Sequence, residues 1–95
     1  MKVKELIERV DGAIGSLKIA IISNQQRSFE SPYTSLEFTE RAVGLQEDLN
    51  ALEKLRERLS NLDPDDDVER YINEKELERI MKFIEEAENL DEHVY

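Results

Sequence analysis

The stretch that decides the fold is "FTERAVGLQEDLNALEKLRERLSNL", residues 38–62. Its apolar residues recur every three or four positions, which is the spacing of side chains that share one face of an α-helix. Thr34 and Glu37, three residues apart, match a capping box at the start of such a helix. The pattern predicts an amphipathic helix over residues 35–62. Its apolar face consists of Phe38, Ala42, Leu45, Leu49, Leu52, Leu55, Leu59 and Leu62.

A second helix is predicted upstream, over residues 3–24. Between Ala13 and Ile22 the only charge is Lys18, so this part is apolar on nearly every side. A row of small residues four apart allows a close approach of another backbone, either within the bundle or in self-association. The row is Gly12, Ser16 and Ala20. The apolar stripe follows a heptad pattern of Val3, Ile7, Val10, Ile14, Leu17 and Ile21, widened by Leu6 and Ala13.

The last third predicts a helix over residues 64–91 with a break near residue 73. Upstream of the break the apolar residues are helically spaced but out of phase with those downstream, and Asn73 with Glu76 forms a second candidate cap. A short fourth helix near 64–72 is the consequence. The downstream stripe consists of Leu77, Ile80, Met81, Ile84, Ala87 and Leu90, with Phe83 beside it. Together these elements predict an all-α fold, an antiparallel three-helix bundle, with residues 1–95 as a single domain.

The acidic stretch "NLDPDDDVERYINE", residues 61–74, allows two structural interpretations. Four of its carboxylates fall at ligand positions of an EF-hand calcium loop, but Val68 stands where that loop needs a glycine. The alternative is a helix start, with Asp63 as N-cap and Pro64 at the first helical position. The aspartates that follow would then favour the positive end of the helix dipole. The helix start explains more of the residues, and we expect it.

Composition limits the function classes. The net charge is −10, and residues 63–95 carry thirteen acidic and four basic side chains, so nonspecific binding to nucleic acid or to an anionic membrane is disfavoured. Cysteine is absent, which excludes thiolate chemistry. The longest apolar-rich run, "AIGSLKIAII" at 13–22, is too short to span a bilayer. We expect a soluble, cytoplasmic protein without a cofactor or a metal.

Catalytic motifs are sparse. The one histidine, His93, stands near the chain's end, and the three glycines do not form a phosphate loop. Two carboxylate pairs, Glu37 with Glu40 and Glu88 with Asp91, resemble in form the pairs with which all-α nucleotide pyrophosphatases hold magnesium. Residues three apart on a helix can share one hard cation. A carboxylate-metal nucleotide hydrolase is therefore one alternative, although we expect no enzyme.

We expect a small, non-catalytic helical interaction or adaptor protein that binds itself as a homodimer or binds a basic protein. Ile19 and Ile22 lie off the main stripe, and an exposed apolar patch of this kind usually marks an interface. The expected interface comprises Ile14, Lys18, Ile19, Ile22, Phe29 and Tyr33. The alternative is an acidic inhibitor or nucleic-acid mimic, of the kind found in phage or mobile-element counter-defence, acting on a basic groove. Its acidic partner face would comprise Asp65, Asp66, Asp67 and Glu69.

Overall fold

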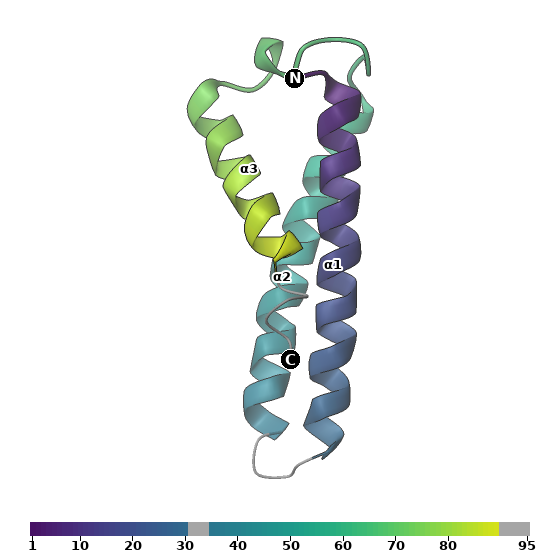
Figure 1. Cartoon of the computed structure of the whole chain (residues 1–95), viewed down its shortest axis with the longest axis vertical. Helices are drawn as coiled ribbons and strands as arrows, with labels where there is room; N and C mark the ends of the chain where they lie inside the picture. The colour runs from purple at the N-terminus through teal and green to yellow at the C-terminus, as the bar shows by residue number, and fades with distance from the viewer. Residues whose placement is uncertain (31–34, 90–95) are drawn as a thin grey trace.

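A computed structural model of the chain describes residues 1–30 and 35–89, and within them the side chains of 1–26 and 40–89. The described part contains the α-helices α1 (Val3–Glu30), α2 (Ser35–Ser60) and α3 (Glu74–Glu88), and a short 3₁₀ helix, η1 (Val68–Arg70). α1 and α2 run antiparallel along a body of 50 × 20 × 17 Å, and α3 crosses them obliquely (Figure 1). The all-α three-helix bundle is confirmed.

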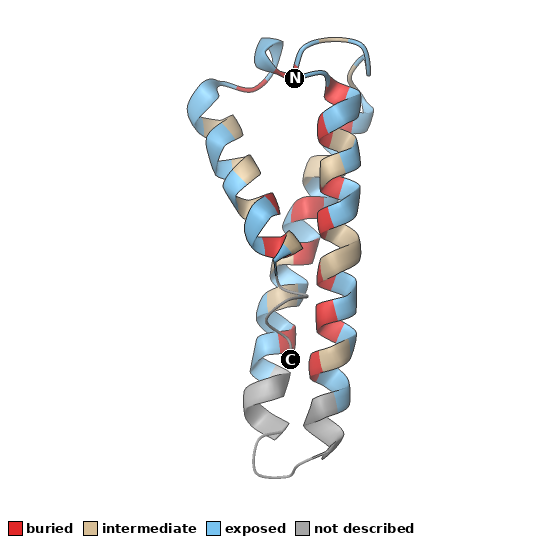
Figure 2. Ribbon diagram, viewed as in Figure 1, coloured by how far each residue is buried: buried red, intermediate tan, exposed pale blue. Residues whose placement is uncertain are grey.

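The core lies along α1, which packs closely against both α2 and α3, whereas α2 and α3 approach each other much less. Because two helices cover α1, its buried stripe is wider than one heptad seam. Leu6 and Ala13 are fully buried, whereas Ile7 and Ile14 are only partly buried. The main core residues are Val3, Leu6, Val10, Ala13, Leu17, Ile21, Leu49, Leu52, Leu59, Val68, Ile72, Ile84 and Ala87, and Figure 2 shows the buried positions along the inner faces of the helices.

The helix start expected at residues 63 and 64 is wrong. Asp63 accepts a hydrogen bond from the backbone N–H of Asp65 at 2.9 Å, and the N–H of Asp66 donates to the Asp63 carbonyl at 3.1 Å, so these residues form a turn. The short fourth helix expected near 64–72 is limited to η1. α3 begins at Glu74, after Asn73, whose side chain accepts from the N–H of Glu76 at 2.8 Å. The expected break and cap at Asn73 are therefore confirmed.

The turn does not start a helix because its backbone serves the start of α1 instead. The first N–H groups of a helix have no partner inside the helix. Here the N–H of Val3 donates to the Asp66 carbonyl at 2.9 Å, and the N–H of Lys4 donates to the Pro64 carbonyl at 3.0 Å. The N–H of Val68 returns a bond to the Met1 carbonyl at 2.9 Å. We call these three bonds the N-terminal tie; they hold the turn across the end of α1, where Figure 1 shows the two segments beside each other.

The connection between the first two helices is shorter than expected. α1 continues to Glu30, six residues past its expected end at 24, so part of the chain expected between the two helices is helical. α2 ends at Ser60, two residues before the expected end at 62. The capping box of Thr34 and Glu37 lies outside the described residues and side chains.

Candidate functional site

Two of the predicted interface residues are solvent-exposed on the side of α1 that faces away from the bundle. The exposed fractions of Ile19 and Ile22 are 58% and 54%, and Lys18 beside them is also exposed. Ile14 belongs to the other side, because it is half-buried and packs against the core. Burial therefore distinguishes Ile14 from Ile19 and Ile22. Phe29 and Tyr33 lie outside the described side chains.

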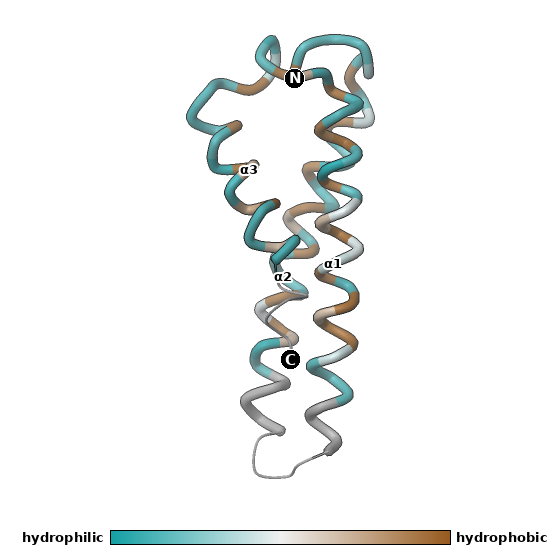
Figure 3. Tube along the Cα trace, in the orientation of Figure 1, coloured by the Kyte–Doolittle hydropathy of each residue, from teal (hydrophilic) through white to brown (hydrophobic). Residues whose placement is uncertain are grey.

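Two glycines extend this exposed face, and the sequence analysis did not place them there. Gly12 and Gly15 stand seven residues before Ile19 and Ile22, and a Cβ added at either glycine would meet nothing within 4 Å. Positions 12, 15, 19 and 22 alternate in spacings of three and four, so they share one side of the helix. We call these four residues the outer face of α1. Figure 3 shows the hydrophobic colouring of the middle of α1.

The small-residue row of Gly12, Ser16 and Ala20 does not line one close helix crossing. Ala20 is fully buried in the bundle, Ser16 is half-buried, and Gly12 is exposed with open space around it. The signal that would have found the outer face is a second heptad spacing on the reverse of the helix. This spacing was missed because two of its four residues are glycines, which are not counted as apolar when a stripe is traced along a helix.

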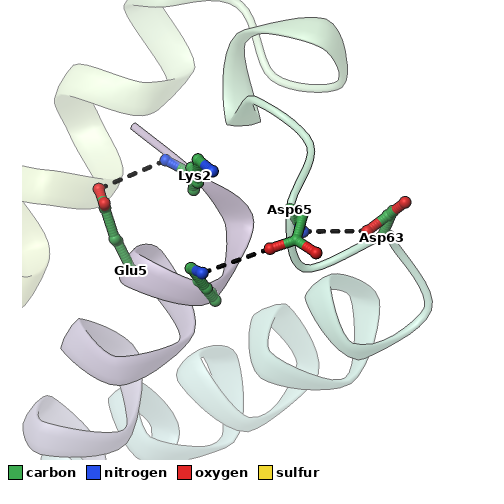
Figure 4. A network of polar contacts seen from close by, with 5 residues as sticks. Lys2, Glu5, Asp63 and Asp65 are labelled. Carbon is green, nitrogen blue, oxygen red and sulfur yellow. Dashed lines mark hydrogen bonds and ion pairs between the residues drawn. The ribbon is translucent and has the colours of Figure 1, made fainter.

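The acidic stretch is occupied mostly by contacts within the chain. Asp65 pairs with Lys4 at 3.3 Å, and Glu69 lies 3.2 Å from the amino group of Met1 (Figure 4 shows the Asp65 contacts). Asp66 accepts from Arg70 at 3.3 Å and from the Tyr71 hydroxyl at 2.5 Å. The remaining member, Asp67, is exposed, and its backbone forms an isolated antiparallel bridge with Lys2.

These contacts also shift two pKa values. The backbone hydrogen bond of Glu69 and then its contact with the Met1 amino group lower the pKa of the Glu69 carboxyl. The hydrogen bond to Asp66 raises the pKa of the Tyr71 hydroxyl. The cluster of Asp65, Asp66 and Glu69 is thus partly neutralised by its own neighbours, which reduces the charge that it offers to a partner.

Metal chemistry finds little geometric support in the part of the chain that the structure describes. Among the described side chains, those of residues 1–26 and 40–89, no group of three His, Asp or Glu side chains is placed to hold a metal ion. Of the two carboxylate pairs, Glu88 is held by Arg9 through two bonds of 3.2 and 3.4 Å, and Glu40 is exposed. The Glu37 side chain and Asp91 lie outside the described part.

An apolar groove runs between α2 and α3, where the two helices diverge. Its larger hollow, about 290 Å³, is lined by Ala51, Leu52 and Leu55 of α2 and by Glu76, Arg79, Ile80 and Phe83 of α3. A second hollow of about 140 Å³ shares Phe83 and continues along α2 to Asp48 and Leu45, with Glu86 and Ala87 on α3 and Leu17 of α1. We call the two hollows together the α2–α3 groove.

The two ends of the α2–α3 groove differ in charge. At one end Glu76 is paired with Arg58 at 3.1 Å. At the other end, partial burial and the nearby carboxylates of Glu47 and Glu86 raise the pKa of Asp48. The charged neighbours that raise the pKa of Asp48 are thus carboxylates, so this end of the groove is acidic.

Comparisons with protein-family models, with curated proteins and with solved structures gave no match for this chain. The outer face of α1, the acidic turn and the α2–α3 groove therefore rest on the geometry of the chain alone. Within the described residues, none of the helices has the length and apolarity needed to cross a membrane.

Proposed function

We propose that the protein is a small, non-catalytic helical interaction protein that self-associates through the outer face of α1. The observation that carries this proposal is the exposure of Ile19 and Ile22, at 58% and 54%, on the side of α1 that points away from the bundle. Neither isoleucine belongs to the core cluster, so bundle formation leaves their apolar surface exposed to water.

The glycines support a helix-to-helix contact at this face. A glycine inside a helix costs about 0.5–1 kcal/mol relative to alanine. Within the described bundle, no other part of the chain packs closely against Gly12 or Gly15, because a Cβ added at either position would meet nothing within 4 Å. In a contact between two α1 helices, the same absence of Cβ atoms would let the backbones approach closely.

A second copy is the partner that the charge distribution favours at this face. Residues 12–22 carry only Lys18, so two acidic chains can meet here without bringing their carboxylates together. A self-complementary patch closes most simply as a two-fold dimer. Four isoleucines would bury about 400 Å² of apolar surface, worth about 10 kcal/mol at about 25 cal/mol per Å². Association itself costs about 4–15 kcal/mol, so we expect a weak dimer that forms at micromolar or higher concentration.

The deciding experiment is the mass of the chain in solution, measured by sedimentation or light scattering over a range of concentrations. We expect the mass to rise from that of one chain to that of two, with little dependence on salt, because the contact is apolar. A chain that stays monomeric at high micromolar concentration would contradict the proposed self-association.

The acidic-inhibitor function is the weaker candidate. Three of its four expected contact residues, Asp65, Asp66 and Glu69, already have partners within the chain. A complex built on this face would weaken steeply as salt rises, in contrast to the α1 dimer. Salt dependence of any complex that the chain forms therefore separates the two proposals.

A further inference from the structure

The α2–α3 groove has the dimensions of a seat for one more helix. From Leu55 to Leu45 it follows ten residues of α2, or about 15 Å at 1.5 Å per residue, which is nearly three helical turns. Leu55, Ile80 and Phe83, which line it, are each half-buried and so retain apolar surface towards solvent. A groove of this kind accepts the apolar face of an amphipathic helix, with anchors at i, i+3 or i+4, and i+7.

The charges at the groove decide which helix fits. At the end near Leu45, Asp48 and Glu86 both line the groove, and Glu47 adds a third carboxylate near Asp48. A cation placed there would meet three carboxylates beside apolar surface, where charge interactions are less screened. A lysine or arginine of a bound helix would supply this cation.

We infer that the α2–α3 groove binds an amphipathic helix of a different protein, seated on Leu55, Ile80 and Phe83, with a basic residue between Asp48 and Glu86. A second copy of this chain fits less well, because its net charge of −10 would be repelled by the acidic end of the groove. The inference is independent of self-association, since it uses α2 and α3 and leaves the outer face of α1 free. A chain with both surfaces would join a dimer to a second protein.

The test uses the full chain and three synthetic peptides of about 18 residues, or roughly 27 Å as a helix. The first peptide has a leucine stripe flanked by lysines, the second has the same stripe flanked by glutamates, and the third is a scrambled form of the first with no stripe. The scrambled peptide is the control for general attraction between a basic peptide and an acidic protein. We expect the first peptide to bind at least about ten-fold more tightly than either of the others.

Amide chemical shifts locate the bound peptide. We expect the shifts to concentrate at Ala51, Leu55 and Phe83. Equal binding of the scrambled peptide, or shifts centred on residues 63–67, would overturn the inference in favour of general electrostatic attraction. If dilution of the chain alone moves the same groove signals, the occupant is a second copy and the inference is equally wrong.

Two substitutions test the groove directly. Ala51→Lys places a positive charge on the exposed rim of the groove and should weaken binding of the lysine-flanked peptide by about ten-fold or more, because like charges repel, whereas Asn50→Lys adds the same charge one residue away and should not. Asp48→Asn should also weaken binding, even though it removes repulsion within the free chain. An affinity that Asp48→Asn leaves unchanged or increases would contradict the role given to the acidic end, whether or not Ala51→Lys folds.

Discussion

Ile19→Asp should convert the proposed α1 dimer into a folded monomer. Ile19 has an exposed fraction of 58%, which corresponds to about 100 Å² of apolar surface or about 2.5 kcal/mol if buried in a partner. A two-fold interface contains this contact twice, so the substitution should cost about 5 kcal/mol, or more than three orders of magnitude in the dimer Kd. An unpaired aspartate at the seam would add to this cost. The free energy of unfolding of the monomer should change little, because the side chain has no place in the core.

Sedimentation at several concentrations measures the dimer Kd, and urea unfolding at low concentration measures the monomer. Val43→Asp is the matched control, since Val43 is 56% exposed but lies on α2, and it should leave the dimer intact. The reasoning fails if both variants dissociate the dimer equally, which would indicate a general effect of charge. It also fails if Ile19→Asp unfolds the chain, because Ile19 would then contribute to the core.

Three smaller changes test other parts of the structure. Asn73→Ala removes the cap on the Glu76 N–H and should lower the free energy of unfolding by about 0.5–2 kcal/mol in urea denaturation, whereas an unchanged value would show that α3 needs no side-chain cap. Gly12→Ala should increase the free energy of unfolding of the monomer by about 0.5–1 kcal/mol, measured in urea, because a Cβ there meets nothing within 4 Å. A lower free energy of unfolding would show that position 12 is in close contact with another part of the chain. Burial and neighbouring carboxylates raise the pKa of Asp48, so its charged form opposes folding at neutral pH, and this opposition disappears as the pH falls through the raised pKa. Asp48→Asn should therefore stabilise the chain slightly at pH 7, by no more than about 0.5 kcal/mol, with no gain at low pH, and an equal gain at both pH values would contradict the cause given.

The spacing of apolar residues was sufficient to predict the helices, because the buried face of each helix consists of the apolar residues that recur every three or four positions. Residues 38–62 predicted α2 to within two residues at its described end, and Asn73 with Glu76 predicted the start of α3, since capping depends on neighbours three residues apart. The helix start at Asp63 failed for the opposite reason. Its local signal was outweighed by hydrogen bonds to Val3 and Lys4, and nothing in residues 61–74 by themselves indicates that α1 would need acceptors there.

Of the candidate sites, one could also be predicted from the sequence and the other could not. The exposure of Ile19 and Ile22 could be predicted because they fall outside the stripe of α1. The α2–α3 groove could not, because it depends on the angle at which α3 crosses the bundle, and a sequence pattern does not fix that angle. Asp48 likewise gives no sign in the sequence that Glu86, on another helix, would raise its pKa.

The N-terminal tie has a consequence for the order of folding. α1 and α2 follow each other closely in the chain, so they can pair after closure of a short loop, whereas the tie joins Val3 to Asp66 across about sixty residues. The entropic cost of loop closure rises by about 0.6 kcal/mol for each doubling of loop length, so a loop of about sixty residues costs about 1.2 kcal/mol more to close than a loop a quarter of that length. The two long helices should therefore associate first, and the end that carries the acidic turn should close last. Amide protons of Val3, Lys4 and Val68 would then exchange with solvent through openings that leave the middle of α1 protected.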